Sequence, residues 1–230
     1  MELNLVKPDS QMYQFITATF NTCKGKCYHD CSYCFCKAMA KRFNHPQQPV
    51  RFDEKEPKTN LGNGNYIFVG SSCDMFAKDI PDEWILKTLY HMDKFDNKYL
   101  LQTKNPDRVM DFIHYTVITS KCDVCTTIES DIFYPDIMGN SPTPQERSIA
   151  MNELSGVVDT YVTIEPIMQF DLNNMVKLIK SCHPKQVNLG ADSGRNNLPE
   201  PSKEKVLRLI AALQKFTVIH NKTNLQRLLK

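Results

Sequence analysis

Three closely spaced cysteines are the residues of this chain best suited to chemistry. Cys27, Cys31 and Cys34 form a C-x3-C-x2-C pattern. Iron–sulfur cubanes are held by cysteine thiolates, usually four of them, so three thiols leave one iron without a protein ligand. A metal with an open coordination position signals chemistry, as it does in catalytic zinc centres. The spacing therefore predicts a reactive metal centre.

Neighbouring residues leave a structural metal site open as an alternative. Cys23 and Cys36 flank the three thiols, and either would complete a closed four-cysteine site for zinc or for a structural cluster. His29, inside the loop, is another zinc ligand. Zinc pairs more commonly come as C-x2-C repeats, of which the loop has one. Both interpretations stand at this point.

The composition is that of an ordinary globular chain. Its 230 residues are 41% hydrophobic and 23% charged, which suits one α/β domain over residues 1–230. The net charge of +2 does not by itself indicate a nucleic-acid partner. Nine cysteines, an odd number, favour metal ligands in a reducing compartment over a disulfide framework. Residues 1–10 contain no apolar stretch of signal-peptide or membrane length, so we expect a cytoplasmic monomer without membrane contact.

Strand-like and helix-like segments alternate along the part of the chain that must position the cysteines. A β-prone run at 15–20 leads into the cysteine loop at 21–36, and a polar excursion rich in proline, glycine and asparagine follows at 45–65. Strand-like runs then recur near residues 66, 98, 124, 160, 187 and 216, with helix-period segments between them. This alternation predicts parallel strands joined by helices.

Local signals place three of these helices. Residues 143–146, Thr-Pro-Gln-Glu, combine a capping box with proline at the first helical position, and Asn105-Pro106 predicts a second helix start. A stripe with i, i+3, i+4, i+7 spacing predicts a helix packed on the sheet: Val206, Leu209, Ile210 and Leu213.

Seven strand signals are too few for a closed eight-stranded barrel. We expect an α/β fold, a partial (β/α)6–7 TIM-like barrel of parallel strands, with an open doubly wound sheet as the alternative. Strands also end in polar turns for purely structural reasons, so each polar residue at a strand end has two interpretations. In a barrel the following residues would share one rim with the cysteine loop: Ser71, Ser72, Asp74, Lys104, Asn105, Glu129, Ser130, Glu165, Asp192, Ser193 and Asn221.

The cysteine pattern, with Tyr33 before the third cysteine and a strand before the loop, resembles the cluster motif of the radical S-adenosylmethionine (radical SAM) superfamily. The resemblance implies a [4Fe-4S] cluster on Cys27, Cys31 and Cys34, with Tyr33 beside the cofactor. It implies that the amino and carboxylate groups of S-adenosyl-L-methionine bind the fourth iron. Reductive cleavage then gives methionine and a 5′-deoxyadenosyl radical that abstracts hydrogen from a substrate. Such an enzyme needs a one-electron donor such as flavodoxin or ferredoxin.

Later segments extend the resemblance and imply cofactor contacts. Residues 102–106 resemble the Thr-Lys step of the spore photoproduct lyase-like branch and of small phage-borne relatives, which implies that Lys104 meets the methionine carboxylate. A solvated residue at a helix start is the alternative for Lys104. Residues 70–74 resemble in position the Gly-rich motif that meets the cofactor's amino group, with serines where Gly-Gly-Glu is commoner. The contacts implied there are from Ser71, Ser72 and Asp74.

The segment at 126–130 lies where the superfamily binds the ribose hydroxyls, which implies contacts from Thr127, Glu129 and Ser130. Carboxylates and hydroxyls suit ribose, and cations suit carboxylates. The resemblance implies Arg147, on the next helix, as a second carboxylate partner, and a surface helix charge is the alternative. Residues 187–194 resemble a late strand-and-glycine segment of the same relatives, in which Asp192 is a candidate catalytic residue.

Each of the remaining thiols can also be interpreted as an ordinary buried cysteine. Cys73 lies on the expected rim, where a thiol could return a hydrogen atom to a substrate radical, or it packs in the core. Cys122 and Cys125 form a C-x2-C pair that would start an auxiliary cluster, or they are buried free cysteines, as we expect for Cys182.

A partial barrel with one open side suits a bulky substrate, and the resemblance points to nucleic acid. An ordinary amphipathic helix after the loop is the alternative for the residues that would line an access path: Tyr33, Phe35, Lys37, Lys41, Arg42 and Phe43. Three functions stay open. They are radical modification or repair of nucleic acid, the same chemistry on a protein or small metabolite, and a non-enzymatic protein with four metal-binding cysteines.

Overall fold

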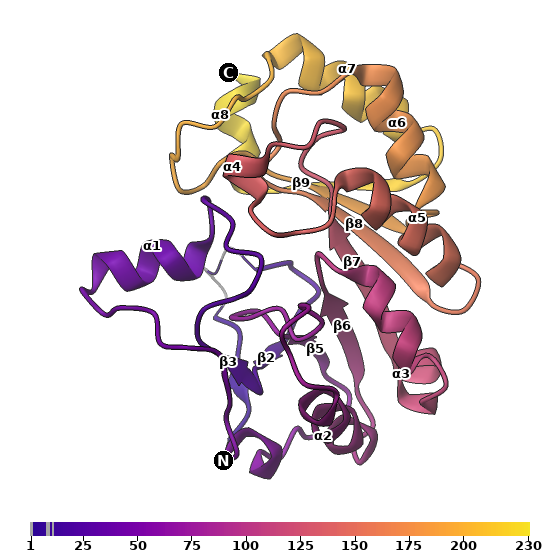
Figure 1. Cartoon of the computed structure of the whole chain (residues 1–230). Coiled ribbons are helices and arrows are strands. Elements are labelled where there is room, and N and C mark those ends of the chain that lie inside the picture. The colour runs from indigo at the N-terminus through magenta and orange to yellow at the C-terminus, as the bar shows by residue number, and fades with distance from the viewer. Residues whose placement is uncertain (1, 8–9, 11) are drawn as a thin grey trace.

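One curved sheet is the framework of the protein (Figure 1). The computed structural model describes residues 2–7, 10 and 12–230. Its sheet has eight strands, and only the pairing of β1 (Asn4–Leu5) with β2 (Ala18–Phe20) is antiparallel. The other strands run parallel to β2 and to one another, and follow it in this order: β5 (Tyr66–Val69), β6 (Lys98–Gln102), β7 (Cys122–Thr127), β8 (Asp159–Ile164), β9 (Gln186–Leu189) and β10 (Val218–Asn221).

The seven parallel strands succeed one another in chain order. A doubly wound sheet needs a reversal of strand order, and the described strands show none, so that alternative is wrong. Within the described part of the chain, β10 pairs with β9 alone and no closing pair joins the two edges. The expected α/β fold, a partial TIM-like barrel of parallel strands, is confirmed.

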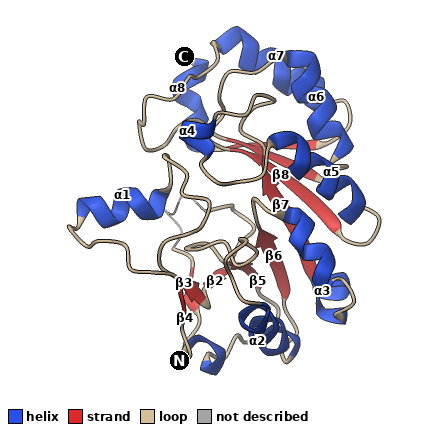
Figure 2. Cartoon of the chain, in the orientation of Figure 1, coloured by secondary structure: helices blue, strands red, loops and turns tan. Residues whose placement is uncertain are grey.

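Helices follow the strands and cover the outer side of the sheet (Figure 2). The longer ones are α2 (Asp82–Asp93), α5 (Pro144–Leu154), α6 (Leu172–Ser181) and α7 (Lys203–Leu213). Shorter helical segments are η2 (Pro106–Phe112), α3 (Thr116–Lys121), α4 (Pro135–Met138), η3 (Thr223–Leu225) and α8 (Gln226–Leu229). No helix in the described residues is long and apolar enough to cross a membrane.

The local helix signals act as expected. Thr143 Oγ1 accepts a hydrogen bond from Glu146 N at 3.2 Å while Glu146 Oε2 accepts one from Thr143 N at 2.7 Å, so the capping box starts α5. A 3-10 helix, η2, begins after Asn105, whose side chain donates to Phe76 O at 2.9 Å instead of capping it. The apolar stripe of α7 is buried against the sheet: Val206, Leu209, Ile210 and Leu213.

The polar excursion at 45–65 contributes one strand of a second, small sheet. There, β3 (Cys23–Lys24) pairs antiparallel with β4 (Arg51–Phe52), and η1 (Glu56–Lys58) follows. Lys24 Nζ forms ion pairs with Asp53 Oδ2 at 2.8 Å and with Glu56 Oε1 at 2.7 Å, which hold this unit together. The cysteine loop and α1 (Phe35–Arg42) lie between β3 and β4. The loop is therefore anchored at both ends.

Residues before the first parallel strand fill part of the barrel interior. Tyr13 and Ile16 pack against the inward-facing side chains Phe68, Leu100 and Cys125. The Tyr13 hydroxyl donates to Gln102 Oε1 at 2.8 Å. Residues 15–17 of the β-prone run are thus interior packing and connection, and β2 begins only at residue 18. These residues fill the interior as far as Gln102, the last residue of β6, and active sites of parallel barrels lie at the rim beyond the carboxyl ends of the strands.

Candidate functional site

The three thiols share one tight loop at the rim. Two turns fold it, because Cys27 O accepts from Asp30 N and Cys31 O accepts from Cys34 N, each at 3.2 Å. Cys31 is buried, while Cys27 and Cys34 are partly exposed, and all three are free thiols. Cys34 directly precedes α1. The loop thus presents its sulfurs from a backbone fixed at both turns.

Helix α4 and the residues directly after it hold this loop in place. Asn140 N donates to His29 O at 2.8 Å, and Ser32 N donates to Ile137 O at 2.9 Å. Gly139 has a φ of 61°, and a Cβ there would overlap with His29 O. Only glycine allows so close an approach. This support was not found from the sequence because its signal is a single glycine more than 100 residues away from the loop.

Neighbouring thiols lower the pKa of two of the cysteines. A hydrogen bond from Cys73 lowers the pKa of Cys27 to about 7. A hydrogen bond from Cys36 lowers the pKa of Cys34 to about 5. Burial raises the pKa of Cys31, and the ammonium group of Lys104 opposes that rise. Since the thiolate is the form that binds metals, this set of thiols suits a metal centre.

Asp74 connects the cysteine loop to the ends of β5 and β6. Its Oδ2 lies 2.8 Å from His29 Nε2 and accepts hydrogen bonds from Thr103 Oγ1 at 3.0 Å and from Lys104 N at 2.8 Å. Burial opposes ionisation, but the hydrogen bond and charge of His29 lower the pKa of Asp74, and the same pair raises the pKa of His29. Asp74 therefore joins the loop to the rim. The sequence pointed to Asp74 but not to this role of His29.

Glu129 is the centre of a buried charge network. It is 0% exposed, as is Arg147, whose Nη1 lies 2.8 Å from Glu129 Oε2. The Tyr33 hydroxyl donates to Glu129 Oε1, and Lys104 Nζ lies 3.8 Å from the same oxygen. Although burial opposes it, the charges of Arg147 and Lys104 lower the pKa of Glu129. Three predicted cofactor contacts, Tyr33, Lys104 and Glu129, are thus brought together.

Arg147 lies in the interior and not at the surface. Its Nη1 also donates to Thr127 O at 2.5 Å. The guanidinium group therefore stabilises Glu129 and the end of β7, and the alternative of a surface charge is wrong. Lys104 is largely buried too, with 16% of its side chain exposed and its Nζ 5.3 Å from the centre of the Tyr33 ring. The alternative of a solvated Lys104 is wrong for the same reason.

The serines of the rim differ in their surroundings. Ser71 Oγ donates to Asn21 Oδ1 at 3.1 Å, and Ser72 N donates to the same atom at 3.1 Å. Ser72 Oγ is buried without a hydrogen-bond partner among the described residues, so it is available to a bound group. Ser130 Oγ donates to Gln169 O at 2.5 Å. Ser71 and Ser72 are close to the cysteine loop, since Cys36 Sγ donates to Ser72 O at 3.2 Å.

The Asp192 carboxylate stabilises the turn in which it lies. Its Oδ1 accepts from Gly194 N at 3.1 Å and from Asn196 Nδ2 at 2.6 Å, and its Oδ2 accepts from Asn196 N. The described contacts of its carboxylate are all within this loop. Its place in catalysis stays a prediction.

A second, partly buried ion pair lies at the ends of β8 and β10. Lys222 Nζ is 2.6 Å from Glu165 Oε2, and Asn224 Nδ2 donates to Glu165 Oε1 at 2.6 Å. A Cβ on Gly190 would lie 2.7 Å from Glu165 Oε1, so the glycine leaves room for the carboxylate. The strand-end pattern indicated Glu165, but Lys222 and Asn224 carry no motif that would have marked them.

Three of the other cysteines lie apart from the loop. Cys122 and Cys125 are buried in β7, as Cys182 is at the end of α6, and burial raises the pKa of all three. No three Cys, His, Asp or Glu side chains within the described residues converge closely enough to hold a single metal ion. A cubane has no such requirement, because each of its cysteines binds a different iron.

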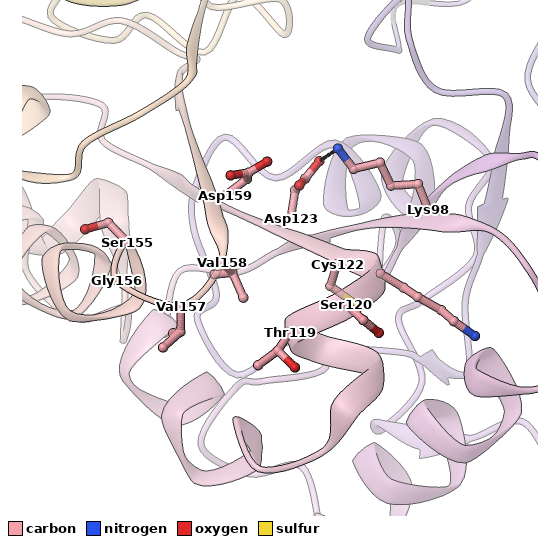
Figure 3. Close-up of a pocket in the computed structure, with 11 residues that line it drawn as sticks. Lys98, Thr119, Ser120, Cys122, Asp123, Ser155, Gly156, Val157, Val158 and Asp159 are labelled. Atoms are coloured by element: carbon pink, nitrogen blue, oxygen red, sulfur yellow. Dashed lines mark ion pairs between the residues drawn. The ribbon is translucent and has the colours of Figure 1, made fainter.

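Two cavities flank the sheet at opposite ends. One of about 460 Å³ adjoins the cysteine loop and is lined by Asn21, Cys36 and Ser72 among others. Its size is that of a small-molecule site. The other, of about 350 Å³, lies at the amino-terminal ends of β6, β7 and β8, where Lys98 Nζ pairs with Asp123 Oδ2 at 2.8 Å (Figure 3). Active sites of parallel barrels lie at the carboxyl-end face, which excludes the second cavity. The first is lined by none of Cys27, Cys31, Cys34, Lys104 and Glu129, so it lies beside the cysteine loop and the buried charge network and does not contain them.

Fold and site together define a partial parallel barrel with a three-cysteine loop on its carboxyl-end rim, facing a buried network of carboxylates and cations. The chain belongs to the family described as "Protein of unknown function (DUF5131)", which it matches over residues 10–216. No curated protein matches its sequence.

Solved structures of spore photoproduct lyase share the fold. One is a double mutant with bound AdoMet and dinucleoside spore photoproduct, with 10% sequence identity, a TM-score of 0.64, and coverage of 96% of this chain and 81% of that chain. Another is complexed with dinucleoside spore photoproduct, with 11% identity, a TM-score of 0.58, and coverage of 93% and 64%. The expected likeness to the spore photoproduct lyase-like branch of the radical SAM superfamily is confirmed for the fold.

Proposed function

We propose that this chain is a radical SAM enzyme that holds a [4Fe-4S] cluster on Cys27, Cys31 and Cys34. The observation that carries the proposal is the position of the three-thiol loop, which is fixed by Asp74, by α4 and by the residues directly after α4 at the rim of a partial barrel. The fold it shares with a lyase structure that contains AdoMet supports the same conclusion.

The residues of the loop fit such a group. Two of the three thiols have a lowered pKa, and the third lies beside the ammonium group of Lys104. Bound there, the cluster supplies the electron that cleaves S-adenosyl-L-methionine to methionine and a 5′-deoxyadenosyl radical. A flavodoxin or ferredoxin is the class of donor that would reduce it.

The rim residues would bind and orient the cofactor. Burial opposes the charge on Lys104, but Cys31 and Glu129 raise its pKa, so the ammonium group persists as a partner for the methionine carboxylate. Arg147 and Lys104 keep Glu129 ionised, and an ionised carboxylate accepts hydrogen bonds from ribose hydroxyls. Ser72 Oγ, buried without a partner among the described residues, is available to the amino group.

We propose nucleic acid as the substrate. One supporting observation is that the lyase structures that share this fold contain a dinucleoside. Another is that the sheet is open on one side, which leaves room for a polymer beside the rim. Cys73, whose thiol donates to Cys27, would lie near the reacting centre as a hydrogen donor.

Cofactor cleavage tests the proposal. The anaerobically reconstituted chain, given dithionite and S-adenosyl-L-methionine, should form 5′-deoxyadenosine and methionine. Lys104→Ala should lower this yield and raise the cofactor concentration needed, whereas Lys180→Ala, on the outer helix α6, should not. A reconstituted chain that forms no 5′-deoxyadenosine would contradict the proposed function.

A further inference from the structure

The helix after the cysteine loop contributes nothing to the core. None of the residues of α1 is buried, and residues 41–46 are all exposed. Figure 1 shows α1 standing away from the sheet that the other helices cover. Residues 35–51, from α1 to the start of β4, are called the basic arm below. The best-covered residues of α1, 36–37 and 39–40, are only half-buried, so packing accounts for one face of the helix and the exposed side chains need another explanation.

The arm carries basic residues and no acidic residue. It contains four of the 28 basic residues and none of the 26 acidic residues. Residues 201–230 are basic as well, with seven bases and one acid, so charge by itself does not distinguish the arm from the rest of the chain. Lys37 pairs with Asp30 at 2.5 Å and ties the helix to the cysteine loop. The exposed cations that remain are Lys41, Arg42 and Arg51.

Two aromatic rings accompany the cations. Phe35 is 71% exposed at the start of α1, and Phe43 is 56% exposed just after its end. The Arg42 guanidinium lies 5.7 Å from the centre of the Phe43 ring. Exposed aromatic rings beside cations are the components with which proteins bind single strands, because bases stack on the rings while phosphates pair with the cations. An acidic peptide would use the charges and leave both rings without a partner.

We infer that the basic arm is a docking surface for single-stranded nucleic acid. The inference rests on the proposed function for its purpose, since Cys34 directly precedes α1 and a strand bound on the arm would lie beside the three thiols. Duplex nucleic acid fits less well, because its bases are already stacked and paired and cannot use the rings. The arm therefore deepens the proposed function by naming where the substrate is held.

Binding of a dye-labelled thymidine 20-mer, followed by fluorescence anisotropy at several salt concentrations, tests the inference. The full chain is used without reductant or S-adenosyl-L-methionine, so the result does not depend on cofactor cleavage. Three phosphate contacts predict a slope of log affinity against log salt of about −2 for a single strand. Lys41→Gln with Arg42→Gln should reduce the slope by about 1.4. Phe43→Ala should weaken binding roughly fivefold or more.

Matched controls distinguish the arm from other exposed groups. Tyr90→Ala removes an exposed ring on α2, and Arg208→Gln removes an exposed cation on α7, and neither should change the affinity. Uridine 20-mers distinguish RNA from DNA as the source of the strand, and polyglutamate supplies charge without bases. The inference is supported if the chain binds the strand with the predicted salt slope and only the arm variants weaken that binding. No salt-sensitive binding, equal loss in the control variants, or equally tight binding of polyglutamate would overturn it. Cofactor cleavage could still succeed in that case, so the two failures are distinguishable.

Discussion

Replacing Arg147 by methionine should destabilise the metal-free chain by about 3 kcal/mol. Arg147 and Glu129 are both fully buried, and their charged atoms are 2.8 Å apart. Removing one partner of a buried pair typically costs about 3 to 5 kcal/mol, because the other charge stays buried without compensation. Lys104 Nζ, 3.8 Å from Glu129, retains part of that compensation, so the lower figure applies. Total stabilities of about 5 to 15 kcal/mol make the loss easy to measure.

Urea unfolding of three variants measures this loss. With a slope of about 3 kcal/mol per molar urea, the midpoint of Arg147→Met should fall by about 1 M. Adding Glu129→Gln removes the stranded charge and should restore part of the midpoint. Arg208→Gln, an exposed change on α7, should stay within about 0.5 kcal/mol of the parent. If Arg147→Met unfolded at the parent midpoint and lost only cofactor affinity, Arg147 would act on the cofactor and the reasoning about Glu129 would be refuted.

Two more substitutions test how the site is supported. Gly190→Ala should cost about 1 to 3 kcal/mol in urea unfolding, because its Cβ would meet the Glu165 carboxylate at 2.7 Å, whereas Gly156→Ala, with 3.6 Å to its nearest atom, should be tolerated. Asp74→Ala should cost a similar 1 to 3 kcal/mol and lower the iron content after reconstitution, because His29 and Lys104 N lose a buried acceptor. Asp79→Asn, an exposed change five residues away, is its control, and equal iron in both variants would contradict this role of Asp74.

The fold could be predicted because its signals are local and repeated. Alternating strand and helix patterns, the capping box at Thr143 and the α7 stripe depend on residues within a few positions of one another. Their sum predicts parallel strands joined by helices, and the choice of a partial barrel over a doubly wound sheet was decided only by the strand order of the folded chain. The β-prone run at 15–20 was the exception, because Phe15 and Ile16 fill the barrel interior, a contact that no local pattern records.

The residues of the site also divide into those that a local pattern marks and those that only the fold brings together. The cysteine spacing and the strand-end residues Glu129 and Lys104 could be found because motifs and strand ends mark them. The contacts that hold the loop, from His29 to Asp74 and from the segment around Gly139, join positions 45 to 110 residues apart. Glu165 was marked as a strand end, but its partner Lys222 lies 57 residues later. Pairing over such distances is a property of the folded chain and leaves no pattern in the sequence.

Iron content after anaerobic reconstitution tests the central claim most directly. The account predicts four irons per chain in the parent and in Cys36→Ala, and a large loss of iron in Cys34→Ala, because the proposed site uses the thiolate of Cys34 and not the thiol of Cys36, whose Sγ donates to Ser72 O. Equal loss of iron in Cys36→Ala, or stable binding of one zinc ion in place of iron, would contradict the three-cysteine site and return the loop to a closed structural centre.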